Sequence, residues 1–255
     1  MRRIGLLALL AATAGLPAAA HAEDDWTFSV TPYVWIAFPQ GDVALAAGGG
    51  SGGSRPTVNP DVQVNFDDIG LSGAFTGSAD ARYGKFGVLG DLTYYEVEAD
   101  KDIAAGPLPD ADGKVTISGT KGMIVGYWRA YETDRASVDL LGGAHYLGID
   151  ADVAVSTPNR GINFSAKEDL WDPVIGVRGK TLIGEHFGVI GLATAGGFGV
   201  SSESLYEVQA YLSYRFNDLL TAEAGYRFYS TKWEGDRIDY DASFSGPLIG
   251  LTFTF

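Results

Sequence analysis

Cysteine is absent from this chain of 255 residues. Its absence excludes a disulfide scaffold, a thiolate metal site, a cysteine nucleophile and an N-terminal cysteine that carries lipid. Basic residues are also few, because 18 Lys and Arg stand against 32 Asp and Glu and leave a net charge of −14. A nucleic-acid-binding protein usually has a basic surface, so the composition argues against nucleic acid as a partner.

Long hydrophobic runs are missing beyond residue 22. No later segment offers about 18 consecutive apolar residues, so the sequence predicts no membrane-spanning helix. The chain is nevertheless 46% hydrophobic, which is too much for a disordered protein. Its 35 glycines are twice the usual share of about 7%.

The first 22 residues are typical of a secretory signal peptide. Arg2 and Arg3 supply the charged start, Ile4–Leu16 the apolar stretch, and Ala20-His21-Ala22 the cleavage site. An uncleaved membrane anchor is the alternative, but the apolar stretch is short and rich in alanine. We expect cleavage after Ala22, which leaves residues 23–255 as one domain.

The rest of the chain alternates between apolar and polar residues with period 2, which indicates strands with two different faces. Ten such runs predict an all-β, up-and-down antiparallel barrel of ten strands, with eight or twelve as alternatives. The runs cover 26–36, 71–83, 86–98, 115–131, 138–150, 171–183, 187–200, 205–216, 219–232 and the C-terminal 249–255.

The predicted connectors alternate between short and long. Two-residue hairpin turns with positive φ are expected at Gly84-Lys85 and Asn217-Asp218, and nearly as short turns at 133–136 and 184–186. Longer loops are expected at 46–60, 101–114 and 156–169, and shorter ones near 201–204 and 234–239. Short turns at one end and longer loops at the other are typical of an outer-membrane barrel, with both termini on the periplasmic side.

The charged residues share one face of each predicted strand, opposite the apolar face. This predicts a charged lumen and an apolar, lipid-facing exterior, the reverse of a soluble ligand-carrying barrel. Only the run 115–131 is ambiguous, because Lys121 and Arg129 share a face with Met123 and Val125. The predicted lumen residues are Asp80, Arg82, Asp91, Asp139, His145, Asp172, Arg178, Lys180, Glu207, Arg215, Glu223 and Arg227.

Aromatic residues near the strand ends predict two girdles at the membrane interfaces. Pro32, Pro173 and Pro247 lie within predicted strands, where proline cannot donate to the ladder. Bulges are therefore expected at Pro32 and Pro247, on the two strands that close the barrel. The inner girdle would contain Trp26, Phe28, Tyr83, Phe86, Phe187 and Phe216, and the outer one Tyr94, Tyr146, Trp171, Tyr206 and Phe228.

The mature chain resembles the small outer-membrane β-barrel proteins of Gram-negative bacteria. The resemblance implies a bacterial outer-membrane location, surrounding lipids and lipopolysaccharide, and assembly by the barrel assembly machinery. That machinery would recognise the terminal Leu251, Phe253 and Phe255. The similarity rests on TPYVW at 31–35, LLGGAHY at 140–146, GVRG at 176–179, GGFGVSS at 196–202, GYR at 225–227 and the ending GPLIGLTFTF.

Candidate catalytic and metal motifs do not have the context that their chemistry needs. The G-x-S-x-G match at 49–53 lies in a Gly/Ser-rich loop, and Asp110–Gly113 lacks the remaining ligands of a calcium loop. His186 is expected in a periplasmic turn, and His145 in the lumen without an evident nucleophile. We therefore expect no catalytic, metal or cofactor site and no enzyme.

Three functions stay open at this point. The near balance of lumen acids and bases favours a salt-bridge-filled barrel with a structural or surface-interaction role. A narrow, weakly cation-preferring diffusion channel is the alternative. A barrel enzyme that modifies lipid A or phospholipid, with His145 as its base, is a remote one. The sequence leaves the oligomeric state open.

Overall fold

The computed structural model describes residues 26–45, 70–102, 112–157, 160–234 and 238–255. The predicted signal peptide and the Gly/Ser-rich loop lie outside these ranges, and this part of the chain contains no helix that could cross a membrane. The strands are β1 (Trp26–Trp35), β2 (Phe38–Leu45), β3 (Gly70–Tyr83), β4 (Phe86–Asp102), β5 (Asp112–Glu132), β6 (Ala136–Thr157), β7 (Arg160–Ile183), β8 (Phe187–Gly196), β9 (Ser204–Arg215), β10 (Leu220–Glu234) and β11 (Ile238–Thr254).

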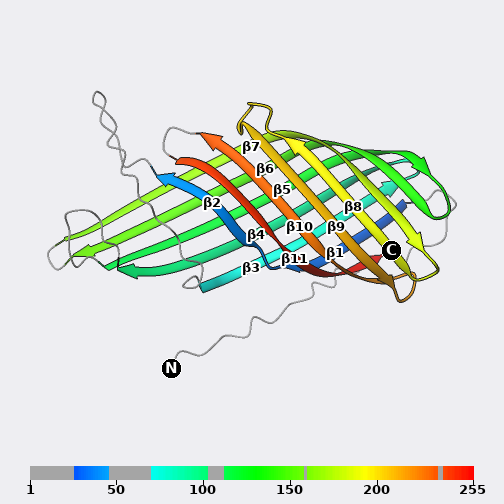
Figure 1. Cartoon of the computed structure of the whole chain (residues 1–255), viewed down its shortest axis with the longest axis horizontal. Coiled ribbons are helices and arrows are strands. Elements are labelled where there is room, and N and C mark those ends of the chain that lie inside the picture. The colour runs from blue at the N-terminus through cyan, green and yellow to red at the C-terminus, as the bar shows by residue number, and fades with distance from the viewer. Residues whose placement is uncertain (1–25, 46–69, 103–111, 158–159, 235–237) are drawn as a thin grey trace.

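These strands form one closed antiparallel barrel (Figure 1). Each strand from β3 to β11 pairs with the next along the chain, and β1 closes the sheet by pairing with both β3 and β11. β2 follows β1 at the same position in the wall, because it pairs with the upper part of β11. The wall therefore has ten positions, which confirms the predicted ten-stranded up-and-down barrel over the alternatives of eight and twelve.

The prediction of bulges at Pro32 and Pro247 is wrong. β1 and β2 pair with β11 in one unbroken register, and both prolines point outward from the ladder. The ladder with β11 has no pairs at Thr31 and Pro32, but the register does not shift there. A second gap lies between Trp35 and Phe38, where the Ile36 amide donates to the Pro247 carbonyl. At this point the Ile36 carbonyl oxygen would collide with any Cβ on Gly246, so glycine permits the close approach of the two strands.

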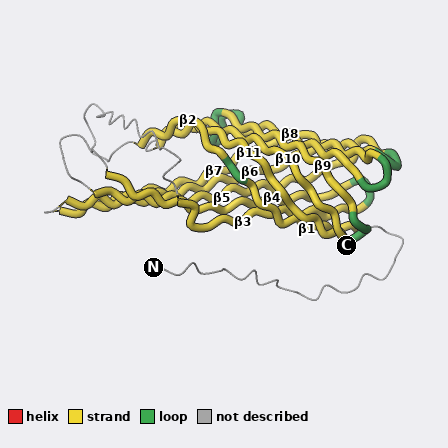
Figure 2. The backbone as a smooth tube through the Cα atoms, turned by 60° about the horizontal axis from the view of Figure 1, so that its bottom comes forward, coloured by secondary structure: helices red, strands yellow, loops and turns green. Residues whose placement is uncertain are grey.

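Most of the predicted long loop at 156–169 is strand, and so are the described residues of the one at 101–114, namely 101–102 and 112–114. β4 continues to Asp102 and β5 begins at Asp112, while β6 and β7 pair without a break from Ala136–Thr181 to Thr157–Arg160. The polar composition concealed these strands, because outside a membrane a two-stranded segment can be polar on both faces. Figure 1 and Figure 2 show the result: β4–β7 project as a long sheet well past the ends of β8 and β9.

The short turns lie at the opposite end of the barrel. Gly84 and Gly184 have φ of 55° and 73°, the left-handed conformation that glycine adopts without strain. The predicted two-residue turn at Asn217-Asp218 is wrong, because β9 ends at Arg215 and β10 begins at Leu220. Asn217 acts through its side chain instead, whose Oδ1 accepts hydrogen bonds from the amides of Leu219 and Leu220.

The connection between β8 and β9 is also longer than predicted. The expected strand over 187–200 ends at Gly196, and residues 197–203 form a folded loop. Gly197 and Gly199 have positive φ, as does Phe198 at 49°, so the chain reverses sharply there. The Gly197 amide donates to the Pro173 carbonyl and fixes the loop against β7.

The outer surface of the barrel is apolar, as predicted. Large hydrophobic side chains such as Val34, Leu212 and Ile249 are exposed on it. The residues of both predicted aromatic girdles lie on this face, and the rings of Trp26 and Phe28 stack while those of Tyr146 and Trp171 contact each other. An apolar exterior of this kind is stable only in contact with lipid.

Candidate functional site

Four charged side chains meet at the centre of the lumen and form what we term the central cluster. They are Asp91 on β4, Lys121 on β5, Glu207 on β9 and Arg227 on β10, so two come from each of two opposite walls. The Arg227 guanidinium lies 2.8 Å from both carboxylates, and the Lys121 ammonium lies 2.5 Å from Glu207. All four are buried, and two acids balance two bases.

Tyrosine and amide side chains surround the central cluster. The Tyr33 hydroxyl donates to Asp91 at 2.7 Å and accepts from Arg227 at 2.6 Å. Gln209 donates to Glu207 and accepts from Tyr211. These partners satisfy buried carboxylates that would otherwise be costly to remove from water.

A second group of charges, the turn-side cluster, lies closer to the short turns. Arg178 on β7 bridges Asp80 at 2.5 Å and Asp139 at 2.8 Å. Arg129 on β5 binds Asp139 at 2.8 Å and Glu132 at 2.8 Å. The Tyr127 hydroxyl donates to Asp80, and its ring lies 4.4 Å from the Arg178 guanidinium carbon.

Apolar side chains occupy much of the remaining lumen. Val125, Val174, Leu205 and Tyr229 are almost completely buried and belong to one contact cluster with partners from β4–β10. Trp35 and Phe244 pack against this cluster from β1 and β11. Side chains from every position of the wall except that of β3 thus meet in this cluster.

The β8–β9 loop folds into the outer mouth of the lumen and is held there by Asp172. This carboxylate accepts hydrogen bonds from the amides of Ser201 and Ser202 and from the Ser202 hydroxyl at 2.6 Å. Ser202 is only 1% exposed, and Thr231 on β10 contacts its hydroxyl. The predicted lumen acid Asp172 is therefore a loop anchor.

His145 lies beside Asp172 in the ladder but makes no hydrogen bond with it. It is 1% exposed, its ring stacks on Tyr229 at 5.5 Å, and neither ring nitrogen has a hydrogen-bond partner. Ser202, the serine held by Asp172, donates its hydroxyl hydrogen to that carboxylate. No nucleophile and base in hydrogen-bond contact occur at this point of the lumen.

The other predicted lumen charges are not ion-paired with either cluster, although Lys180 lies close enough to Arg178, Asp80 and Asp139 to interact with their charges. Within the described ranges, no ion pair joins Arg82, Lys180, Arg215 or Glu223 to another residue. Arg82 donates to the Thr27 hydroxyl and the Gly84 carbonyl, Glu223 is half-buried, and Lys180 and Arg215 are exposed near the short turns. Arg215 lies next to the β9–β10 turn, so its depth along the strand separates it from the buried charges.

Lys121 and Arg129 belong to the two clusters, although the sequence analysis left their strand ambiguous. They share the lumen face of β5 with Met123, Val125 and Tyr127, while Ile124 and Trp128 point outward. The ambiguity arose because we expected apolar residues only on the lipid face. Two basic residues on one face of the run were the signal that could have assigned it.

The described residues contain no group of three or more His, Asp or Glu side chains placed to hold a metal ion. What the arrangement provides is a balanced, mutually neutralised set of buried charges. Such a set holds opposite walls of the barrel together.

No protein-family model matches the chain, and no curated protein matches it. Among solved structures, the outer membrane protease OmpT from Escherichia coli is 7% identical with a TM-score of 0.55, covering 93% of this chain and 99% of that one. The NalP autotransporter translocator domain from Neisseria meningitidis, 10% identical, has a TM-score of 0.42 and covers 89% of this chain and 86% of that one.

Ail from Yersinia pestis, 12% identical, has a TM-score of 0.32 and covers 91% of this chain and 99% of that one. Identities this low establish the fold alone, and only the similarity to OmpT is high enough to support that. The fold, the apolar exterior and the charged lumen agree with one another. The chain therefore has the fold of an outer-membrane β-barrel, similar to that of OmpT.

Proposed function

We propose that this protein is a closed, non-conducting barrel that anchors a projecting extracellular sheet for structural or surface contacts. The observation that supports this most directly is the central cluster. Its ion pairs connect β4 and β5 with β9 and β10 across the lumen, and Glu207 and Arg227 are 0% exposed. A hydrated ion would have to break these pairs to pass, at a cost of several kcal/mol.

The projecting sheet supports the second half of the proposal. β7 has 24 residues, whereas about 9–11 are enough to cross a membrane. Its pairing with β8 covers only Val174–Ile183, which leaves the segment 160–173 beyond the end of β8, roughly 45 Å of strand. A sheet of this length exceeds what barrel closure needs, so we infer that it serves contacts outside the membrane. The proposal assigns the chain no catalytic role.

The closed lumen is tested by single-channel conductance of the folded mature protein in a planar bilayer under a salt gradient. We expect a silent bilayer for the unmodified protein and for Arg215→Ala, whose side chain lies at the exposed end. The double variant Arg227→Ala/Glu207→Ala should conduct, because both side chains leave the central cluster. A steady, cation-preferring conductance of the unmodified protein would contradict the proposal and establish the narrow diffusion channel instead.

The role of the projecting sheet is tested by shortening its longest hairpin. Replacing residues 152–165 with an Asn-Gly turn connects the cross-strand pair Ala151 and Ala166 directly. We expect normal folding and normal envelope resistance to detergent, but reduced adherence of the cells to surfaces. Loss of detergent resistance with unchanged adherence would favour the structural role, and no effect of either kind would argue against the proposal.

A further inference from the structure

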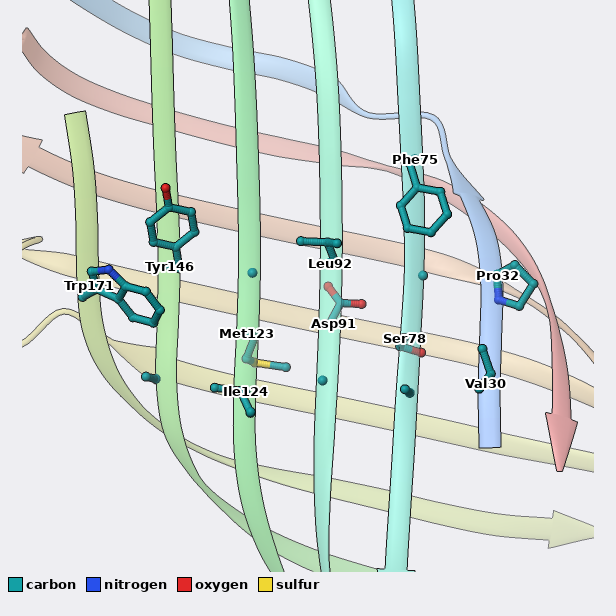
Figure 3. A pocket seen from close by; sticks show the side chains of 15 residues that line it. Val30, Pro32, Phe75, Ser78, Asp91, Leu92, Met123, Ile124, Tyr146 and Trp171 are labelled. Carbon is teal, nitrogen blue, oxygen red and sulfur yellow. The ribbon is translucent and has the colours of Figure 1, made fainter. Parts of the chain in front are cut away.

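The lipid-facing wall contains a hollow of about 500 Å³, which we call the outer groove (Figure 3). It crosses β1, β3, β4, β5, β6 and β7, six neighbouring positions of the wall. Phe75, Leu92, Ile124, Tyr146 and Trp171 form its sides (Figure 3). Because these residues belong to the apolar exterior, acyl chains are the medium that fills the hollow in a membrane.

The groove follows two adjacent rows of cross-strand partners. One row contains Pro32, Gly77, Leu92, Gly122, Tyr146 and Trp171, and the other Val30, Ala79, Gly90, Ile124 and Ala144. It therefore runs across the strands rather than along them. Five of these positions are glycine or alanine, and they form the floor.

The floor glycines are not required by packing within the barrel. In the lumen, a Cβ on Gly87 or Gly119 would lie within 2.3 Å of a tyrosine ring, so these glycines are sterically necessary. A Cβ on Gly90 or Gly122 would meet no atom closer than 3.9 Å. Gly142 has similar room elsewhere on the exterior, but it does not line the hollow. Larger side chains at these two positions would therefore fit into the groove without a clash, so packing within the barrel does not explain the glycines.

The length of the groove matches one leaflet of the membrane. Six strand positions about 4.8 Å apart make it roughly 24 Å long. At the strand tilt of about 45° that barrels adopt, this length covers roughly 17 Å of membrane depth, close to half of the ~30 Å hydrocarbon core. One extended acyl chain within a single leaflet has this reach.

The two ends of the groove differ in chemistry. Trp171 and Tyr146 lie at the outer end, next to the β8–β9 loop, where Ser201 bonds to the Trp171 backbone. The Tyr146 hydroxyl donates to Asp169 there, and Lys167 pairs with Asp150 at 3.5 Å. The other end, at Val30 and Pro32, is apolar. A lipid in this groove would enter from the outer leaflet.

We propose that the outer groove binds one acyl chain of a lipid A molecule, the lipid of the outer leaflet, with its polar end at Tyr146 and Trp171. The chain lies over Gly122 and Gly90 toward Val30. This site is independent of whether the lumen conducts, so its failure and that of the proposed function are distinguishable.

Native mass spectrometry of the refolded mature protein tests the proposal. The probes are purified lipid A and, in a separate sample, a phospholipid of the same acyl length. We expect one retained lipid A per barrel. Gly90→Leu/Gly122→Leu should fill the floor and lower the retained fraction roughly tenfold. Trp171→Ala, which removes a side wall without filling the groove, should also weaken retention.

The matched control is Gly142→Leu, an outward-facing glycine outside the groove, which should retain lipid A normally. The heat-dependent gel mobility of each variant verifies that it is folded. Equal retention of the phospholipid, unchanged retention in Gly90→Leu/Gly122→Leu and Trp171→Ala, no retention at all, or a dimer that covers the groove would each overturn the proposal.

Discussion

Arg227 on β10 places its guanidinium 2.8 Å from the Asp91 carboxylate on β4, on the opposite side of the lumen. The same guanidinium lies 2.8 Å from Glu207 on the neighbouring strand β9. One side chain thus connects two walls of the barrel that are distant in sequence. Its ring contacts reinforce this position, because the guanidinium carbon lies 4.9 Å from the Trp35 ring.

Replacing Arg227 with alanine should lower the free energy of unfolding by about 3–5 kcal/mol, because Asp91 and Glu207 each lose a buried ion-pair partner. Urea unfolding in lipid vesicles, followed by tryptophan fluorescence, measures the change. Arg215→Ala is the control, and its exposed side chain predicts a change within about 0.5 kcal/mol. Equal stability of the two variants would show that the central cluster does not hold the walls together.

The same substitution at two neighbouring glycines on β6 should have different effects on the free energy of unfolding. A Cβ on Gly143 would lie 2.1 Å from the Ile124 carbonyl oxygen, whereas one on Gly142 would meet nothing within 4 Å. Gly143→Ala should therefore lower the free energy of unfolding by about 1–3 kcal/mol, because backbone atoms of β5 must move. Gly142→Ala should cost nothing. Thermal unfolding of both variants checks this, and a stable Gly143→Ala protein would contradict the close approach of β5 and β6.

The last residue should matter for assembly more than for stability. The Phe255 amide donates to the Phe28 carbonyl at 2.8 Å, and its ring is exposed on the outer face. Phe255→Ala keeps this backbone bond but removes the aromatic ring that we expect the assembly machinery to recognise. The folded fraction in cells should fall several-fold, while refolding in detergent should be little changed. Ile249→Ala is the control, and an equal loss in both variants would refute a terminal signal.

The sequence predicted the wall of the barrel well and its interior only in part. Alternation assigned the faces of Asp80, Asp91 and Arg227 because a strand has a strict period of two. It did not distinguish Arg227 from Arg215. Alternation places both on the lumen face, but Arg227 lies in the middle of the barrel and Arg215 at its end. Polar composition also misled: the segment 156–169 resembles a loop in sequence, yet most of its residues pair as strands beyond the level where β8 ends.

Two properties followed from the sequence itself: a strand-forming chain with an apolar and a charged face, and hence a barrel with its apolar side toward lipid. Local pattern suffices for these, because each depends on residues that are near neighbours in the chain. The tertiary structure decided which charges meet, how Asp172 anchors the β8–β9 loop, and where side chains leave the outer groove open. Those features depend on contacts across the closed sheet, between residues such as Asp91 and Arg227 that are 136 positions apart.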